Sequence, residues 1–318
     1  MTDSKAIRNV AIIGGGLMGR GIAEVAAKSG FATTLVKASG QGAEATRARI
    51  EKSLNKAVER GKLASEDAAA ALARLTVTGE RDALASADIV IESIIEDLDT
   101  KRELFLGLVD VVPRHCLFAS NTSTLRIQDL APPGAEGRTI GLHFFSPVPA
   151  MRLVELAYLE ATPEDAKARA TEFVEALGKT PIPVLDSSGF IVNRLLVPYL
   201  LGAVAAYAQG LAPAPNIDTA MKLGCAHPVG PLMLCDLIGL DIVYSMSKLL
   251  YRDFGDARFR PPALLRRLVQ EGQLGKKSGA GFYDHSQRPA VPSDTVWQLI
   301  SAGRIGSEEA QTAAVADL

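Results

Sequence analysis

Four short segments of this sequence carry the side chains best suited to chemistry. Ser123 and His143 each come at or just after the end of an apolar run that predicts a buried strand. Open α/β sheets bind their ligands along the carboxyl edge of the strands, so we expect both side chains at that edge. Hydroxyl, imidazole, carboxylate and amide groups there can donate, accept or move protons. The four segments are residues 120–123, 143–147, 154–156 (with Glu155) and 189–194 (with Asn193).

A glycine-rich turn near the N-terminus predicts the ligand that these side chains would serve. The apolar run at residues 10–13 leads into Gly14, Gly16 and Gly19, which fit the G-x-G-x-x-G pattern of a dinucleotide-binding βαβ unit. The helix that follows would present free N–H groups and a positive dipole end to phosphates. The candidate cofactor-binding residues of this turn are Gly14, Gly16, Leu17, Met18 and Gly19.

The elements that must position these residues alternate between strands and helices through the first half of the chain. This alternation predicts a mainly parallel sheet covered on both faces, which is a Rossmann-type α/β domain. Residues 42–75 are rich in Ala, Arg, Glu and Lys and break at Gly61, so we expect a helical hairpin inserted after the second strand. The predicted strands are 10–13, 33–36, 76–78, 87–92, 116–119, 139–142, 153–156 and 180–185, and further helices are predicted at 101–112 and 163–177.

The pattern changes near Asp186, where strands give way to helices. We therefore predict two domains, a dinucleotide-binding domain at residues 1–185 and an all-α domain at residues 186–318. The apolar stretches at 195–207 and 232–240 exceed what so small a domain would bury by itself, which predicts a homodimer or burial against the first domain. The segment after His285 carries no strong signal, although residues 296–300 could form one helical turn.

Composition excludes several classes of protein. The chain has 318 residues and a formal net charge of −2, so it lacks the basic excess of nucleic-acid-binding proteins. No apolar run is long enough to span a bilayer, and the first residues lack the apolar core of a signal peptide. Cys116, Cys225 and Cys235 have no metal-ligand spacing and are expected to be buried, reduced thiols of a cytoplasmic protein without a metal site.

The ordered motifs together resemble the 3-hydroxyacyl-CoA dehydrogenase family, and its 3-hydroxybutyryl-CoA dehydrogenases in particular. The resemblance runs from about Ile7 to about His285 and implies an NAD(P)-dependent oxidoreductase that acts on an (S)-3-hydroxyacyl-CoA. The segments that carry it are residues 14–19, 120–123, 143–149, 151–155, 186–194, 227–231, 236–241 and 277–283.

The resemblance implies a role for each polar residue of the four segments. His143 matches the general base that removes the proton from the C3 hydroxyl as hydride moves to the nicotinamide, and the protonated form would act as the acid in reduction. Glu155 matches the carboxylate that orients this histidine. Ser123 and Asn193 match the donors to the reacting oxygen and the thioester carbonyl, although each could instead cap a helix. His115, His227 and His285 are expected to be structural.

Three further residues match positions that bind the cofactor or the CoA moiety. Glu96 and Lys101 match positions that hold the nicotinamide-side ribose, although two such charges could also form an ordinary solvated pair. Lys56 lies on the helical hairpin and matches a lysine that meets the CoA phosphates; as a lysine on a charged helix face, it could equally point into solvent.

Lys37 departs from the pattern of an NAD-specific site. The end of the second strand normally carries Asp or Glu, which binds the adenosine ribose 2′-hydroxyl. A lysine attracts a 2′-phosphate instead, and Ser39 could add a hydroxyl donor. The sequence therefore predicts that NADP(H) is used at least as well as NAD(H); the other possibility is that Lys37 points into solvent and NAD binds weakly.

Two other functions remain open from the sequence. The same chemistry could act on an acyl-carrier-protein thioester or on an unusual hydroxyacyl unit of a biosynthetic pathway. Alternatively, the chain could bind a dinucleotide without catalysis, although the complete set of Ser123, His143, Glu155 and Asn193 argues against this.

Overall fold

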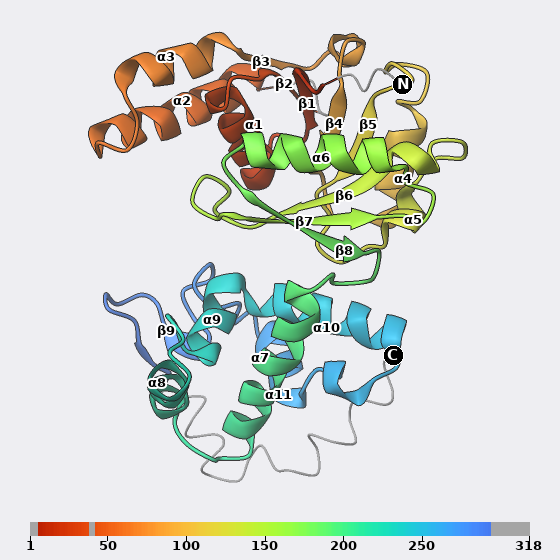
Figure 1. Cartoon of the computed structure of the whole chain (residues 1–318). Helices are drawn as coiled ribbons and strands as arrows, with labels where there is room; N and C mark the ends of the chain where they lie inside the picture. The colour runs from red at the N-terminus through yellow and green to blue at the C-terminus, as the bar shows by residue number, and fades with distance from the viewer. Residues whose placement is uncertain (1–5, 38–41, 294–318) are drawn as a thin grey trace. The chain divides into compact units, whose positions relative to one another are not determined.

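The computed structural model describes residues 6–37 and 42–293. These residues divide into two compact units, with the boundary between Phe190 and Ile191 (Figure 1). Within the described residues, the first unit contains an eight-stranded sheet in the order β3-β2-β1-β4-β5-β6-β7-β8. Its strands are β1 (Asn9–Ile13), β2 (Ala32–Val36), β3 (Leu75–Thr78), β4 (Ile89–Glu92), β5 (Leu117–Ser120), β6 (Thr139–Phe144), β7 (Leu153–Tyr158) and β8 (Thr180–Leu185).

The sheet is mainly parallel, as the sequence predicts, but it changes direction once. Strands β1 to β6 pair in parallel, whereas β7 runs antiparallel to β6 and β8 runs parallel to β7. The strand order reverses between β1 and β4, which is the switch point where open α/β sheets bind ligands.

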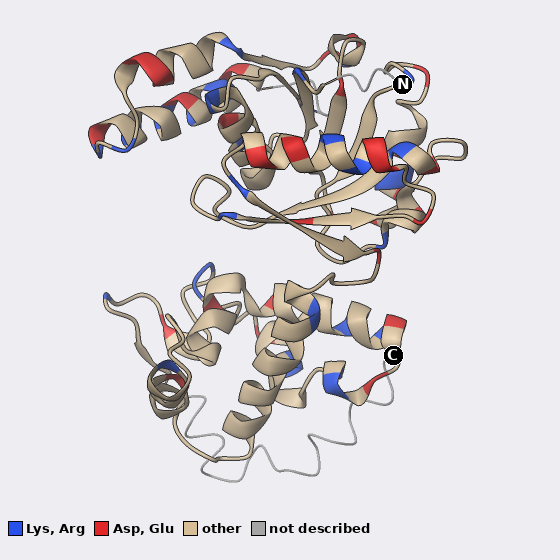
Figure 2. Ribbon diagram, in the orientation of Figure 1, with Lys and Arg blue, Asp and Glu red and all other residues tan. Residues whose placement is uncertain are grey.

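Alternating side chains of the strands form two cores, one on each face of the sheet. Val10 and Ile12 of β1 pack with the core under α1 (Leu17–Lys28), α2 (Ala43–Glu59), α3 (Ser65–Ala73) and α6 (Glu164–Ala176). Ala11 and Ile13 of the same strand pack with the core under α4 (Leu98–Leu106) and α5 (Ile127–Leu130). Period-two alternation therefore produces a sheet covered on both faces. Most of the charged residues of this unit lie on its helices and loops, and few lie on its strands (Figure 2).

The inserted hairpin forms as predicted. Helices α2 and α3 are separated at Gly61, whose φ of 67° is left-handed and favours glycine. Ile50 and Leu54 of α2 are buried, whereas most of the charged side chains around them are exposed.

One predicted helix has different bounds. The sequence predicts a helix over residues 101–112, but α4 spans Leu98–Leu106. It begins earlier because the Asp97 side chain accepts a hydrogen bond from the Thr100 N–H and caps the helix. The buried side chains of Leu108 and Val112 continue the helical spacing although the chain there runs in turns.

The second unit is helical, as predicted, with its own core. The buried side chains of its helices, such as Leu200, Val243 and Leu265, pack together with Phe282. A short antiparallel pair, β9 (Tyr283–Asp284) and β10 (Val291–Pro292), was not indicated by the sequence. The helices are α7 (Val192–Ala208), α8 (Ala214–Gly224), α9 (Pro231–Ile238), α10 (Leu240–Phe254) and α11 (Ala263–Gln270).

Among the described residues, none of the helices combines the length and apolar character needed to cross a bilayer. The predicted helical turn at residues 296–300 lies outside the described residues, as does Ser39.

Candidate active site

The glycine turn between β1 and α1 has the shape that a dinucleotide requires. Gly14 has a φ of 120°, and a Cβ atom there would lie 2.2 Å from the Ser93 carbonyl oxygen after β4. A Cβ at Gly19 would lie 1.9 Å from the Gly14 oxygen, so only glycine lets α1 pack this close to the turn. A Cβ at Gly16 would meet nothing within 4 Å, which leaves open space at the N-terminus of α1. These residues fit a cofactor diphosphate.

His143 and Glu155 face one another across the antiparallel pair of strands β6 and β7. They are direct register partners, which places their side chains on the same face of the sheet. The Nδ1 atom of His143 lies 2.7 Å from Oε2 of Glu155, and the two residues are 6% and 1% exposed. Because a carboxylate can only accept, this contact places the imidazole proton on Nδ1 and leaves Nε2 able to take a proton.

Aromatic rings and a backbone hydrogen bond hold the His143 strand in place. The Phe145 and Phe190 rings lie 4.4 Å and 5.7 Å from the imidazole centroid. The Phe144 N–H donates to the Asn121 side-chain oxygen at 2.9 Å, which ties β6 to the Ser-Asn-Thr-Ser segment. The segment predicted around Ser123 is thus attached directly to the strand that carries the histidine.

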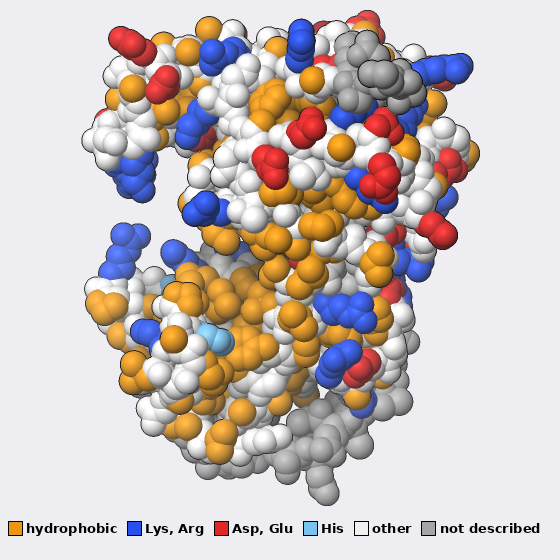
Figure 3. Space-filling view, in the orientation of Figure 1, with side chains coloured by type: hydrophobic (Ala, Val, Ile, Leu, Met, Phe, Trp, Pro, Cys, Tyr) orange, Lys and Arg blue, Asp and Glu red, His pale blue; other side chains and the backbone are white. Residues whose placement is uncertain are grey.

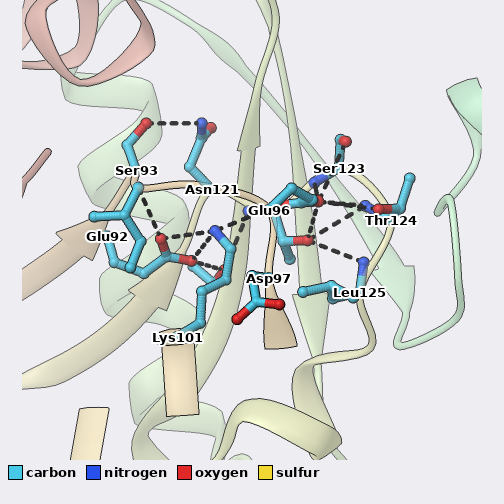
Figure 4. Close-up of polar contacts among 12 residues, drawn as sticks. Glu92, Ser93, Glu96, Asp97, Lys101, Asn121, Ser123, Thr124 and Leu125 are labelled. Carbon is cyan, nitrogen blue, oxygen red and sulfur yellow. Dashed lines mark hydrogen bonds and ion pairs between the residues drawn. The ribbon is translucent and has the colours of Figure 1, made fainter. Parts of the chain in front are cut away.

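Glu96 organises the Ser-Asn-Thr-Ser segment (Figure 4). Its Oε1 atom accepts hydrogen bonds from the Thr122 hydroxyl at 2.6 Å, the Ser123 N–H at 2.9 Å and the Thr124 hydroxyl at 3.0 Å. Burial by itself would raise the pKa of Glu96, but the charge of Lys101 and these hydrogen bonds hold the pKa below its usual value. The residue is therefore a carboxylate at neutral pH, and it fixes the loop that presents Ser123.

Lys101 links Glu96 to a second, fully buried carboxylate, Glu92. The Lys101 ammonium lies 2.7 Å and 2.8 Å from the two Glu92 oxygens and 3.3 Å from Oε2 of Glu96. The Ser120 hydroxyl also donates to Glu92, and the Ile94 N–H donates at 3.2 Å. Glu92 is 0% exposed and Lys101 is 1% exposed, so this is a buried ion pair at the carboxyl ends of β4 and β5 (Figure 4).

Two family models match this chain in succession. The model described as "3-hydroxyacyl-CoA dehydrogenase, NAD binding domain" matches residues 9–187, and the corresponding C-terminal domain matches residues 189–285. The chain belongs to the 3-hydroxyacyl-CoA dehydrogenase family. It is 43% identical over 285 residues to 3-hydroxybutyryl-CoA dehydrogenase of Mycobacterium tuberculosis. The aligned region covers 89% of this chain and 100% of that protein.

Other members of the 3-hydroxyacyl-CoA dehydrogenase family are similar over the same length. The mitochondrial hydroxyacyl-coenzyme A dehydrogenase of Sus scrofa is 41% identical over 287 residues, covering 88% of this chain and 91% of that protein. The crystal structure of (S)-3-hydroxybutyryl-CoA dehydrogenase from Ralstonia eutropha matches with a TM-score of 0.85 and 40% identity, covering 89% of this chain and 100% of that one. The chain is therefore an oxidoreductase of the type that binds a nicotinamide cofactor.

In the dehydrogenase's first unit, His143 and Glu155 are in direct contact across β6 and β7, and Ser123 follows β5, the strand that pairs with β6. Asn193 lies in the second unit, is 7% exposed and occupies the second position of α7. Lys56 is exposed on α2, and Figure 3 shows Lys and Arg side chains gathered at the end of the α2–α3 hairpin. Lys37 follows β2 and is half-buried.

Several of the alternative structural explanations are wrong. Asn193 does not cap α7, because the cap position is Ile191, and Ser123 does not cap α5, because the cap position there is Arg126. Glu96 and Lys101 are not a solvated pair, because Lys101 is buried. The stem of Lys37 lies near the glycine turn, where a Cβ atom at Gly15 would be 2.9 Å from its Cγ.

Each of the remaining histidines contacts a side chain of its own unit. His115 pairs with Asp88 at 3.0 Å, His227 contacts the Tyr199 hydroxyl at 2.9 Å, and His285 pairs with Asp236 at 2.9 Å.

The three cysteines are free thiols, but one expectation about them is wrong. Cys116 and Cys235 are buried as expected, whereas Cys225 is exposed at the end of α8. In the part of the chain that the structure describes, no group of three or more metal-ligating side chains gathers.

Glu92 is the residue that the sequence analysis missed. It appears in the sequence only as the last residue of a predicted apolar strand, nine positions before Lys101. A carboxylate at the buried end of such a strand is the one available signal, because a charge there must have a partner. The identity of that partner requires the fold.

We expect Glu92→Gln to destabilise the enzyme by roughly 3 kcal/mol, because it removes the buried carboxylate that lies 2.7 Å from the Lys101 ammonium and leaves the half-exposed Glu96, at 3.3 Å, to balance that buried charge. Urea unfolding measures this loss. The double variant Glu92→Gln/Lys101→Met should recover much of it, because removing both charges of a buried pair is far less costly than removing one. Equal losses in the single and double variants would contradict this interpretation.

Proposed function

We propose that this chain interconverts short (S)-3-hydroxyacyl-CoA and 3-oxoacyl-CoA thioesters. The observation that carries the proposal is the buried 2.7 Å contact between His143 Nδ1 and Glu155, which leaves Nε2 for the substrate at the carboxyl edge of the sheet. A bound nicotinamide cofactor supplies the hydride acceptor in oxidation and the hydride donor in reduction.

His143 acts as the base and the acid in this proposal. In oxidation, Nε2 takes the proton of the C3 hydroxyl, and the resulting imidazolium is stabilised by Glu155 through Nδ1–H. In reduction, the same imidazolium returns the proton to the C3 oxygen. Ser123 and Asn193 are the proposed donors to the reacting oxygen and the thioester carbonyl.

The remaining site residues bind rather than react. Glu96 and Lys101 are the proposed contacts of the nicotinamide-side ribose. Their ion pair lies on the segment that follows β4, and Ser93 at the start of this segment lies against Gly14 of the glycine turn and accepts a hydrogen bond from Asn121. Lys56 is the proposed contact of the CoA phosphates, supported by its exposed position on a basic helix end.

The experiment that tests the reaction is loss of reduced-nicotinamide absorbance with acetoacetyl-CoA, run in parallel with NADH and NADPH. Turnover establishes the reaction class. Turnover only with an acyl-carrier-protein thioester would change the substrate carrier, and cofactor binding without turnover on any thioester would contradict the proposal.

We also propose that NADP(H) is used at least as well as NAD(H), because Lys37 stands where an acid would bind the 2′-hydroxyl. We expect Lys37→Asp to raise the KM for NADPH by about 10-fold and to lower the KM for NADH, since it replaces a phosphate partner with a hydroxyl acceptor. Steady-state kinetics with both cofactors measures the change. A wild-type enzyme with a strong NADH preference would contradict the proposal.

We propose a homodimer on the basis of the second unit's apolar surface. Leu195, Leu211 and Leu223 are 68%, 75% and 81% exposed, and Figure 3 shows hydrophobic side chains gathered on the visible face of this unit. Light scattering should give a mass of about twice 33.6 kDa. A monomer would contradict this.

We propose a cytoplasmic location because the three cysteines form no disulfide, as is typical of a reducing compartment. Cell fractionation with an antibody to the chain tests it, and recovery of the chain outside the cytoplasmic fraction would contradict the proposal.

A further inference from the structure

A second cationic side chain, Arg20 of α1, contacts the glycine turn beside Lys37. The Nη1 atom of Arg20 donates to the Gly15 carbonyl oxygen at 2.7 Å. Among the described residues, no carboxylate forms an ion pair with Arg20. The hydrogen bond to Gly15 uses one guanidinium donor and leaves others for a ligand.

Lys37 approaches the same glycine from β2. A Cβ atom at Gly15 would lie 2.9 Å from Cγ of Lys37, so the lysine stem passes directly over this residue. The Lys37 ammonium lies 3.0 Å from the position of a Cβ at Gly42, which is the cap residue of α2. Two cations from two different elements therefore flank Gly15, the residue between the first two glycines of the fingerprint.

A third cation adds to this concentration of positive charge. Partial burial and then the charge of Arg49 on α2 lower the pKa of the Arg20 guanidinium, so Arg49 acts on Arg20 from the neighbouring helix. Like charges held together are unfavourable unless an anion binds between them. Arg20 and Lys37 thus place two cationic side chains at the glycine turn and the end of β2, and Arg49 adds positive charge from α2.

The position of this charge identifies the anion. The end of β2 is where a dinucleotide-binding fold recognises the adenosine ribose, with an acid for a 2′-hydroxyl or a cation for a 2′-phosphate. We propose that Arg20 is a second selectivity-determining residue that binds the 2′-phosphate of NADP(H) together with Lys37. This inference rests on the proposed preference for NADP(H). It adds the Arg20 guanidinium, whose paired N–H donors match two phosphate oxygens better than the single ammonium of a lysine does.

Binding of two nucleotides tests this without any turnover. Adenosine 2′,5′-bisphosphate and 5′-AMP differ only in the 2′-phosphate, and calorimetry gives a Kd for each. For Arg20→Ala we expect the Kd of the bisphosphate to rise by about 10-fold or more, and that of 5′-AMP to change by less than about twofold. The matched control is Lys28→Ala at the opposite, exposed end of α1, which should change neither.

Other outcomes would overturn the assignment. An equal loss for both nucleotides in Arg20→Ala would mean that Arg20 supports the turn or meets the 5′-phosphate. Equal wild-type affinity for the two nucleotides would mean that no 2′-phosphate site exists. Arg20→Lys keeps the cation and should recover part of the bisphosphate affinity; no recovery would favour a purely structural role for the Gly15 contact.

The reaction and this inference can fail separately. If wild type reduces acetoacetyl-CoA but the ratio of kcat/KM for NADPH and NADH is unchanged in Arg20→Ala, the inference fails and the proposed reaction stands. If wild type shows no turnover but binds the bisphosphate through Arg20, the proposed reaction fails and the phosphate site stands.

Discussion

His143→Ala should lower kcat with acetoacetyl-CoA by about 10³-fold while leaving the KM for the reduced cofactor within a factor of about two. General acid–base catalysis by one positioned side chain contributes a factor of this order. The loss should fall on kcat because the imidazole is aligned for the reacting oxygen, whereas the glycine turn that fits the cofactor follows a different strand, β1. Steady-state kinetics with each substrate varied in turn separates the two parameters.

A second histidine provides a matched control for this result. His115 also pairs with a buried carboxylate, Asp88, at 3.0 Å, but it lies just before β5 rather than at the carboxyl edge of the sheet. His115→Ala should keep kcat within about twofold of wild type. If both variants lose the same activity, the effect of His143→Ala comes from lost folding and His143 is not the acid or base. Thermal unfolding of both variants accompanies the assay.

Much of the first unit is predictable from the sequence because its signals are local. The apolar run before Gly14, the break at Gly61 and the alternation of strands and helices each reflect backbone preferences over a few residues. The glycine positions are also visible in the local sequence pattern. The reason that Gly14 must be glycine is not local, because Ser93, which follows the neighbouring strand β4, leaves no room for a Cβ atom.

Features that depend on strand order are not predictable in this way. Spacing along the chain cannot show that β7 turns antiparallel, and that reversal makes His143 and Glu155 direct partners across two strands. The same holds for Glu92, whose contacts come from α4 and from the neighbouring strand β5. These residues meet only once the sheet has formed.

The contacts of Arg20 could not be predicted from the glycine motif, although the residue lies beside it in the sequence. Arg20 comes directly after the last glycine of the fingerprint, where the sequence marks only a helix interior. The structure shows its guanidinium folded back onto Gly15, five residues earlier, which is a contact that the glycine pattern does not specify. Recognising the motif therefore predicts that a cofactor binds, but not which charges surround it.

Glu155→Gln should lower kcat by about 10²-fold or more, although Glu155 itself does not exchange a proton with substrate. The glutamine retains the shape of the side chain but removes the charge that stabilises protonated His143 across the 2.7 Å contact. It also allows an amide N–H to face Nδ1, which would favour the tautomer with its proton on Nε2. The KM for the cofactor should stay within about twofold, and Glu164→Gln, an exposed residue of α6, is the control for charge loss alone.

The double variant decides whether Glu155 acts through His143. If it is a positioning residue, His143→Ala/Glu155→Gln should have the same kcat as His143→Ala, because the carboxylate has no imidazole left to orient. If the two losses multiply, Glu155 acts on the substrate or on the fold independently of His143. Such a result would remove the contact between Nδ1 and Oε2 as the basis of the proposed proton transfer.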